Sequence, residues 1–187
     1  MPYLGPDVGR AVLLAKKVQP ENHVEKEAVG RLRMETWRFE GYEPQDHAGD
    51  CYLESHDDHG DLWSIYIDHV LAASARVCLH HTCDEFPEAD TLSPQNLKSI
   101  RNGPYAVFSR LVIRPGYQKL GLSRMLDDIR TAFARSSGAQ RIVLSTLFDS
   151  PRFHALEKKG FAFCGFSLSS AQWPKRPGAC WLMKPLF

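Results

Sequence analysis

The segment that decides the fold, residues 108–123, reads FSRLVIRPGYQKLGLS. Its first half is rich in apolar and β-branched residues and stops at a Pro-Gly pair, which predicts a strand that ends in a turn. Beyond the turn, apolar residues recur at helical spacing, at Leu122, Met125, Leu126, Ile129 and Phe133. The segment therefore predicts a strand, a tight loop and the start of a helix.

The predicted loop has the features of a phosphate site. The first N–H groups of a helix have no partner within the helix, and they carry a partial positive charge. They can hold a phosphate without any basic side chain. Gly121, just before the helix, lets the backbone come close to a ligand. We therefore expect a phosphorylated cofactor to bind at this loop.

Composition limits the remaining classes of function. The chain has 187 residues and 43% hydrophobic content, which suits one domain with a sizeable core over residues 1–187. Its net charge of +1 provides no overall field that would attract nucleic acid or an anionic membrane. No apolar run is long enough to span a bilayer. We therefore expect neither nucleic acid nor a membrane as a partner.

The cysteines indicate the compartment. Five cysteines are scattered along the chain without a CxxC pair, which predicts free thiols in a reducing environment. The first residues lack the charged start and apolar core of a signal peptide. Together these observations predict a cytoplasmic protein. The spacing of the histidines, acids and cysteine at 56–59 and 80–83 matches no standard zinc pattern, so no metal is expected.

The remaining chain alternates strands and helices, which predicts a single α/β (α+β) domain. Strands are expected within 9–18, at 62–67, 70–79 and 105–113, and at 141–146, 161–166 and 180–184. Helices are expected from 20–22 onward, from 122 to about 136, and from about 151 to 160. Residues 41–60 and 80–104 are expected to be mostly loop, with room for one short helix in the first and a helical turn near 96–100 in the second.

Three motifs in order carry a resemblance to a known family. Ile113–Ser123 is similar to Val-x-Pro-x-Tyr-Arg/Gln-x-x-Gly-x-Gly/Ala and departs only at Ser123. Glu157–Phe161 is similar to a helix end of the form Glu-Lys-x-Gly-Phe, and Leu182–Leu186 is similar to a closing strand with Met-Lys and Leu. In this order the motifs resemble the GNAT superfamily of acyl-CoA-dependent N-acyltransferases.

The resemblance implies a fold and a donor site. The fold would be one mixed, mostly antiparallel sheet of six to seven strands, flanked by helices and splayed between 105–113 and 141–146. The pantetheine arm of the cofactor would lie along Leu111, Val112 and Ile113. The pyrophosphate would lie on the backbone amides of Gln118, Lys119, Leu120, Gly121, Leu122 and Ser123. Asp149 stands where the family often has a cofactor-binding Asn, although an Asp there also suits a helix N-cap.

The implied reaction transfers an acetyl group from acetyl-CoA to a primary amine by direct attack on the thioester. A backbone N–H near Leu111 would stabilise the charge that develops on the carbonyl oxygen. The family frequently has a Glu or Asp on the strand at 105–113 or on the one after it. Here these positions hold Ser109 and Ser145, which could orient a water but are not bases unaided. The tyrosine that often acts as its general acid is replaced by Leu156, and His154 is the nearby alternative.

Two other functions stay open. Ser109-Arg110, with Arg33 and Arg76, resembles autoinducer synthases and long-chain N-acyl amino acid synthases that use acyl carrier protein. Arg110 lies inside an apolar strand, so it must pair with a carboxylate or face the substrate cleft. The missing tyrosine and acidic base are also consistent with a non-catalytic acyl-CoA sensor. The acceptor is expected to be a small-molecule or peptide amine, and a homodimer is left open.

Overall fold

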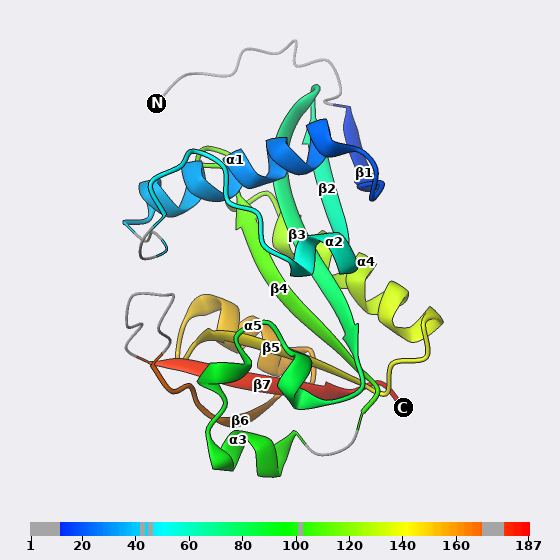
Figure 1. Ribbon diagram of the computed structural model, residues 1–187, viewed down its shortest axis with the longest axis vertical. Coiled ribbons are helices and arrows are strands. Elements are labelled where there is room, and N and C mark those ends of the chain that lie inside the picture. Colours follow the sequence, from blue (N-terminus) through cyan, green and yellow to red (C-terminus); the bar gives the residue numbers. More distant parts are fainter. Residues whose placement is uncertain (1–11, 42–43, 45–46, 101–102, 170–177) are drawn as a thin grey trace.

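The computed structural model describes residues 12–41, 44, 47–100, 103–169 and 178–187. Seven strands form one mixed sheet in the order β1-β2-β3-β4-β5-β7-β6 (Figure 1). The strands are β1 (Leu13–Lys17), β2 (Asp61–Ile67), β3 (Val70–His80), β4 (Tyr105–Ile113), β5 (Arg141–Leu147), β6 (Ala162–Phe166) and β7 (Ala179–Pro185). They lie where the sequence predicts strands, and the mostly antiparallel sheet confirms the predicted fold class.

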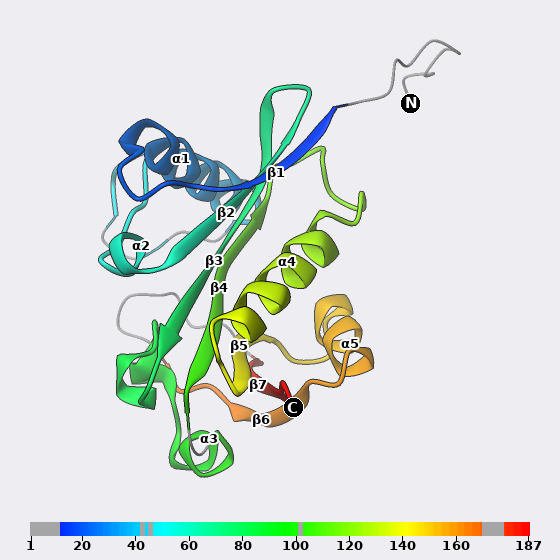
Figure 2. The same ribbon diagram turned by 90° about the vertical axis from the view of Figure 1, so that its right-hand side faces the viewer.

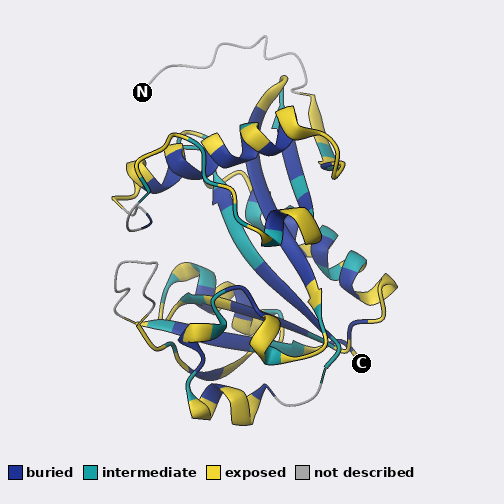
Figure 3. Ribbon diagram, viewed as in Figure 1, coloured by how far each residue is buried: buried dark blue, intermediate teal, exposed yellow. Residues whose placement is uncertain are grey.

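Helices cover both faces of the sheet. They are α1 (His23–Phe39), α2 (His56–His59), α3 (Pro94–Ser99), α4 (Leu122–Ser136) and α5 (Pro151–Lys158), with short 3₁₀ turns η1 (Cys83–Glu85) and η2 (Ala89–Thr91). Figure 2 shows α1 and α2 on one face, and α4 and α5 on the other. The central strands between these layers are mostly buried, whereas the outer side of α1 is exposed (Figure 3).

The sheet divides between β4 and β5. These strands form the parallel pair of the sheet, and they are joined only where Tyr105–Phe108 lies opposite Arg141–Leu144. Beyond this stretch β4 continues with β3, while β5 continues with β7. The two half-sheets diverge as Figure 1 shows, which confirms the predicted splay. We call the space between residues 109–113 of β4 and 145–147 of β5 the wedge.

A β-bulge lies on β4 at the start of the wedge. Ala75 of β3 falls opposite two residues of β4, Arg110 and Leu111, because the register shifts there. Arg110 has a φ of 51°, a left-handed conformation that is uncommon outside glycine. A bulge interrupts the ladder and changes the direction of a side chain, often beside a functional site. This bulge is therefore the local reason why a charged side chain can leave an otherwise apolar strand.

The two helices beside the wedge begin differently. Gly121 caps α4 in a left-handed conformation (φ 78°) and brings no side chain to its first N–H groups. The α5 helix has Ser150 as its N-cap, whose Oγ accepts a hydrogen bond from the N–H of Phe153 at 3.1 Å. The prediction that Asp149 caps this helix is therefore wrong. With Ser150 as the cap, Pro151 takes the first helical position, which suits its fixed φ.

The core follows the predicted helical spacing. Leu122 and Leu126 of α4 are buried against the central strands, while α5 buries Phe153 and Leu156. All five cysteines lie in the described residues and are free thiols. Within the described ranges, no helix combines the length and the apolar character needed to cross a membrane.

The core predicts a contrast between two leucines. Leu126→Ala should lower the free energy of unfolding by about 2–5 kcal/mol, because it leaves a cavity under a fully buried side chain. Leu97→Ala, at a position that is 41% exposed, should cost much less. Chemical denaturation of both variants measures the difference, and equal losses would contradict the assignment of α4 to the core.

Candidate active site in the sheet wedge

The wedge opens into a cavity with a volume of about 1240 Å³. Both half-sheets line it, together with the start of α5 and the end of α1. Lining residues include Trp37, Glu40, Glu88, Val107, Phe108, Ser109, Arg110, Leu111, Gln118, Arg130, Leu144, Ser145, Leu147, Arg152, Phe166, Leu168 and Trp181. The walls are thus apolar beside β5 and β7 and charged beside β4.

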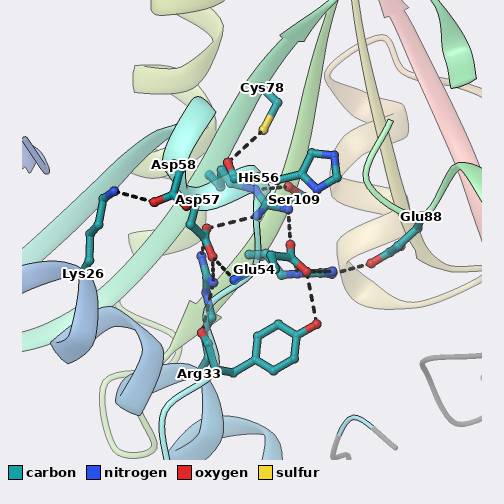
Figure 4. Close-up of polar contacts among 12 residues, drawn as sticks. Lys26, Arg33, Glu54, His56, Asp57, Asp58, Cys78, Glu88 and Ser109 are labelled. Carbon is teal, nitrogen blue, oxygen red and sulfur yellow. Dashed lines mark hydrogen bonds and ion pairs between the residues drawn. The ribbon is translucent and has the colours of Figure 1, made fainter. Parts of the chain in front are cut away.

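Arg110 supplies the charge on the β4 side and is held by two carboxylates, Glu54 and Glu88, which are labelled in Figure 4. Its Nε and Nη2 each donate to Glu54, both at 2.9 Å, and its Nη1 donates to Glu88. Burial alone would lower the pKa of Arg110, but Glu88 and Glu54 together raise that pKa above its ordinary value. Arg110 therefore both pairs with carboxylates and faces the cavity, so the two roles proposed from the sequence are compatible.

A second pair of arginines lies deeper. Arg33 of α1 donates to both oxygens of Asp57, at 2.7 and 2.8 Å, and both side chains are almost completely buried. Arg76 of β3 donates to Asp57 at 3.0 Å and contacts Glu54. Its Nε also donates to the Oγ of Ser109 at 3.1 Å. Ser109 is thus tied to the network as well as to the cavity.

Charge balances within this cluster, which we call the arginine network: Arg33, Arg76 and Arg110 with Glu54, Asp57 and Glu88. Burial raises the pKa of Glu54, but Arg110 and Arg76 outweigh it and lower that pKa below its usual value. The pKa of Asp57 is also lowered, because Arg33 outweighs the effect of burial. Both acids are therefore carboxylates at neutral pH, and they fix α2 and the loop before it against β3 and β4.

Another charged group lies on the opposite face of the sheet. Arg130 of α4 is buried over the ring of Phe108, with 4.3 Å between its guanidinium carbon and the ring centroid. It donates to the backbone oxygen of Arg76 at 2.9 Å and to Asp127 at 2.8 Å. Burial lowers the pKa of Arg130 to about 10 despite Asp127. Arg152 shares the same carboxylate and lines the cavity.

Beyond Phe108, the edge of β4 that faces the wedge has no strand partner among the described residues. The N–H of Arg114 donates to the oxygen of Ala72 on β3 at 2.8 Å. Backbone groups alternate in direction along a strand. Val112 therefore points its amide toward β3, and Ile113 points its amide away from β3 into the wedge. Such an edge can pair with the amides of an extended ligand.

The predicted site residues divide into two groups. Ser109, Ser145, Leu111 and Gln118 line the cavity together. The remaining donor-site residues, Val112, Ile113, Lys119, Leu120, Gly121, Leu122, Ser123 and Asp149, do not line it.

His154 lies apart from the cavity lining. Its side chain is half exposed on α5, and its Nε2 lies 2.8 Å from Asp149 while its Nδ1 lies 3.1 Å from Glu157. The structure therefore pairs two of the predicted residues, His154 and Asp149, on the surface. The roles predicted for them, catalysis for His154 and cofactor binding for Asp149, stay predictions.

The sequence shows some members of the arginine network but not how they meet. The resemblance to autoinducer synthases singled out Arg33, Arg76 and Arg110, whereas the acids Asp57 and Glu88 fall in segments that the sequence predicts to be mostly loop. Glu54 was missed. The sequence feature that could have identified it is its position three residues before Asp57. At this spacing, two carboxylates of one short segment can form ion pairs with several arginines.

No protein-family model matches the sequence, and no curated protein matches it. Solved structures do. FeeM, an N-acyl amino acid synthase from uncultured soil microbes, is 11% identical with a TM-score of 0.70 over 94% of this chain and 92% of its own. BjaI, a CoA-dependent acyl-homoserine lactone synthase, is 14% identical with a TM-score of 0.63 over 94% and 84%. The ribosomal-protein-S18-alanine N-acetyltransferase from Escherichia coli is 13% identical with a TM-score of 0.58 over 94% of both chains.

These likenesses extend over nearly the whole chain. The protein therefore has the GNAT fold, as the three sequence motifs predicted.

The arginine network predicts a contrast between two neighbouring acids. Asp57→Asn should lower the free energy of unfolding by about 3–5 kcal/mol, because Arg33 and Arg76 lose a buried counter-charge. Asp58→Asn removes only an ion pair to Lys26 from a side chain that is 69% exposed, and should cost at most about 1 kcal/mol. Urea denaturation at pH 7 measures both.

Acid titration gives a second measurement of the same network. The folded-state pKa values of Asp57 and Glu54 lie below their unfolded values of about 4, so their stabilisation is present above that pH. It should be lost as the pH falls below about 4 toward the folded-state values. Asp57→Asn should make this acid-dependent loss shallower. An unchanged slope would contradict a charged Asp57.

Proposed function

We propose that the protein is an N-acyltransferase that moves an acyl group from a phosphopantetheine thioester to a primary amine. Coenzyme A and acyl carrier protein both present such a thioester. The observation that carries the proposal is the wedge: among the described residues, β4 has no strand partner on this side beyond Phe108, and the edge lies beside a large cavity. The GNAT fold supports the same assignment.

Two backbone features suit the donor. The amide of Ile113 can pair with the pantetheine arm in place of a neighbouring strand. The first N–H groups of α4 follow Gly121, whose missing side chain leaves them open to the phosphate of the donor. Arg152 lines the cavity on the same face of the sheet as α4. The donor would then enter from the α4 side with its thioester in the wedge.

The chemistry follows from this position. A neutral amine attacks the thioester carbonyl carbon, a C–N bond forms and the C–S bond breaks, and the thiolate leaves and takes a proton. Negative charge develops on the carbonyl oxygen during attack, and a backbone N–H of the interrupted ladder near Leu111 would stabilise it. Ser109 and Ser145 line the same cavity and would orient the amine or a water.

The cavity favours an acyl group longer than acetyl. Its volume of about 1240 Å³ exceeds the roughly 300–1,000 Å³ that holds a drug-sized ligand, so it has room beyond the pantetheine arm. Apolar side chains from β4 to β7 line that room: Val107, Leu144, Leu147, Phe166, Leu168 and Trp181. FeeM and BjaI, which share the fold, are named for acyl amino acid and acyl-homoserine lactone synthesis.

Transfer of an acetyl group is the second candidate. The sequence of Ile113–Ser123 supports it, because this motif resembles that of ordinary acetyltransferases. The likeness to an alanine N-acetyltransferase supports it as well. A non-catalytic sensor of acyl-CoA would share the donor site but would release no thiol.

Thiol release over a matrix of donors and amines separates these candidates. Acetyl-CoA, octanoyl-CoA, dodecanoyl-CoA and dodecanoyl acyl carrier protein are each combined with amino acids, amino acid amides, alkyl amines and short peptides. We expect kcat/KM for a long acyl donor to exceed that for acetyl-CoA at least about tenfold, since each buried CH₂ contributes about 0.8 kcal/mol.

The outcomes discriminate cleanly. Preference for acetyl-CoA would support the second candidate, and a difference between the CoA and carrier-protein donors identifies the source of the phosphopantetheine. Binding of the donors without thiol release would support the sensor. Absence of both binding and release would refute the proposal.

The donor site predicts a contrast at Gly121. Gly121→Glu should abolish binding of coenzyme A, because it adds a side chain and a negative charge where the phosphate is expected. Gly121→Asn is the control, since Asn tolerates the left-handed conformation and brings no charge; it should weaken binding far less. Isothermal titration with coenzyme A measures both, and equal affinities would place the phosphate elsewhere.

A further inference from the structure

Glu88 is the carboxylate that contacts both sides of the wedge. It accepts a hydrogen bond from Arg110 on β4, and its Oε2 lies 3.5 Å from the Oγ of Ser145 on β5. Its side chain is 22% exposed and lines the cavity. Among the described cavity residues the other acid is Glu40, at the end of α1. Glu88 therefore stands where an acceptor would meet the thioester.

The backbone holds Glu88 in an unusual conformation. Its φ of 65° and ψ of 28° are left-handed, which is uncommon for a residue with a side chain. The N–H and Oγ1 of Thr91 both donate to its carbonyl oxygen, at 2.9 and 2.8 Å. The indole of Trp181 on β7 donates in turn to Thr91 at 3.1 Å. Strain of this kind persists where the surroundings fix it, and it is concentrated at functional sites.

The carboxylate has capacity for a further donor. A carboxylate offers about four lone-pair sites, and Arg110 and Ser145 account for two of them in the described structure. Arg110 is also held by both oxygens of Glu54, so it does not depend on Glu88 alone. Glu88 can therefore take a hydrogen bond from an incoming ammonium group.

We infer that Glu88 is the catalytic residue that binds the acceptor's ammonium group and removes its proton, an assignment that rests on the proposed acyl transfer. The ammonium gives one proton to Glu88, which passes it to solvent. The neutral amine then attacks the thioester carbon. The nitrogen loses its second proton as the C–N bond forms, and the departing thiolate takes it. The loop before η2 thus supplies the base that the strands lack.

The charged groups around Glu88 come from several elements. Arg110 faces it from β4, with Glu54 behind that arginine, and Glu40 lines the same cavity from the end of α1. Arg130 and Arg152 line the cavity from α4 and α5. Because several of these charged groups share the cavity with Glu88, variants at Glu88 are needed to isolate its part.

The test uses Glu88→Gln with the donor and alkyl amine that give the fastest thiol release in the wild-type protein. At pH 7 we expect a loss of about 10²–10⁴-fold in kcat/KM for the amine, as for removal of a general base. The loss should shrink as the pH rises toward the ordinary amine pKa of about 10.4, because the free amine then needs no base. A purely structural lesion would lower the rate by the same factor at every pH.

Three measurements complete the design. Asp90→Asn makes the same change at an exposed residue of the same loop, and it should leave the rate within about twofold, as expected for a surface charge. Glu88→Asp keeps the carboxylate, so it should be slower with the wild-type pH dependence. Coenzyme A affinity checks that the donor site of each variant is intact.

Each outcome decides the assignment. Wild-type rates in Glu88→Gln, or a loss independent of pH, would refute the role of Glu88 while the acyltransferase function stands. If Glu88→Gln does not fold, Glu88→Asp decides: a changed pH dependence refutes the role. A wild-type protein that releases no thiol refutes the proposed function itself, and the role of Glu88 with it.

Discussion

The separation of β4 from β5 is the constraint on which the rest of the structure depends. If the two parallel strands stayed paired along their whole length, their backbone groups would hydrogen-bond to each other and leave no room for a ligand. Here pairing ends after Phe108 and Leu144, and each strand keeps a partner only on its other side. The open edge lies at the centre of the sheet, where a ligand can reach both faces. The fold thus lacks β4–β5 backbone hydrogen bonds in the wedge, and side-chain contacts connect the elements around it instead.

On the α1 side of the sheet, the arginine network contributes such side-chain contacts. The bulge at Arg110 sends a guanidinium out of β4, and Glu54 and Glu88 meet it from two different loops. Buried ion pairs give little net stability, but removal of one partner is costly because it strands the other charge. The main effect of the network is therefore to fix the positions of the segments that carry Glu54, Asp57 and Glu88, rather than to add net stability. It fixes two segments, the one that leads into α2 and the one that leads into η2, to the edge of the wedge.

Sequence patterns predicted the backbone better than the site. Residues 108–123 showed both the strand and the α4 start, because apolar periodicity and a Pro-Gly turn are local signals. The cap of α5 was misplaced by one residue, since Asp149 and Ser150 are both good caps and only the conformation decides between them. Arg110 was recognised as a charge that needs a partner. The partner could not be named, because Glu54 and Glu88 lie 56 and 22 residues away along the chain.

The same reasoning explains why a base need not lie on a strand. A strand residue in the wedge points along a direction that the pleat fixes, and at Ser109 and Ser145 the chain has only hydroxyls. A loop can deliver a longer side chain from outside the sheet, provided that its backbone is rigid. Thr91 and Trp181 supply that rigidity by fixing the carbonyl of Glu88 to β7. Glu88 is thus anchored to one half-sheet through its backbone and to the other through Arg110. The position of its carboxylate in the wedge therefore depends on the relative position of the two half-sheets.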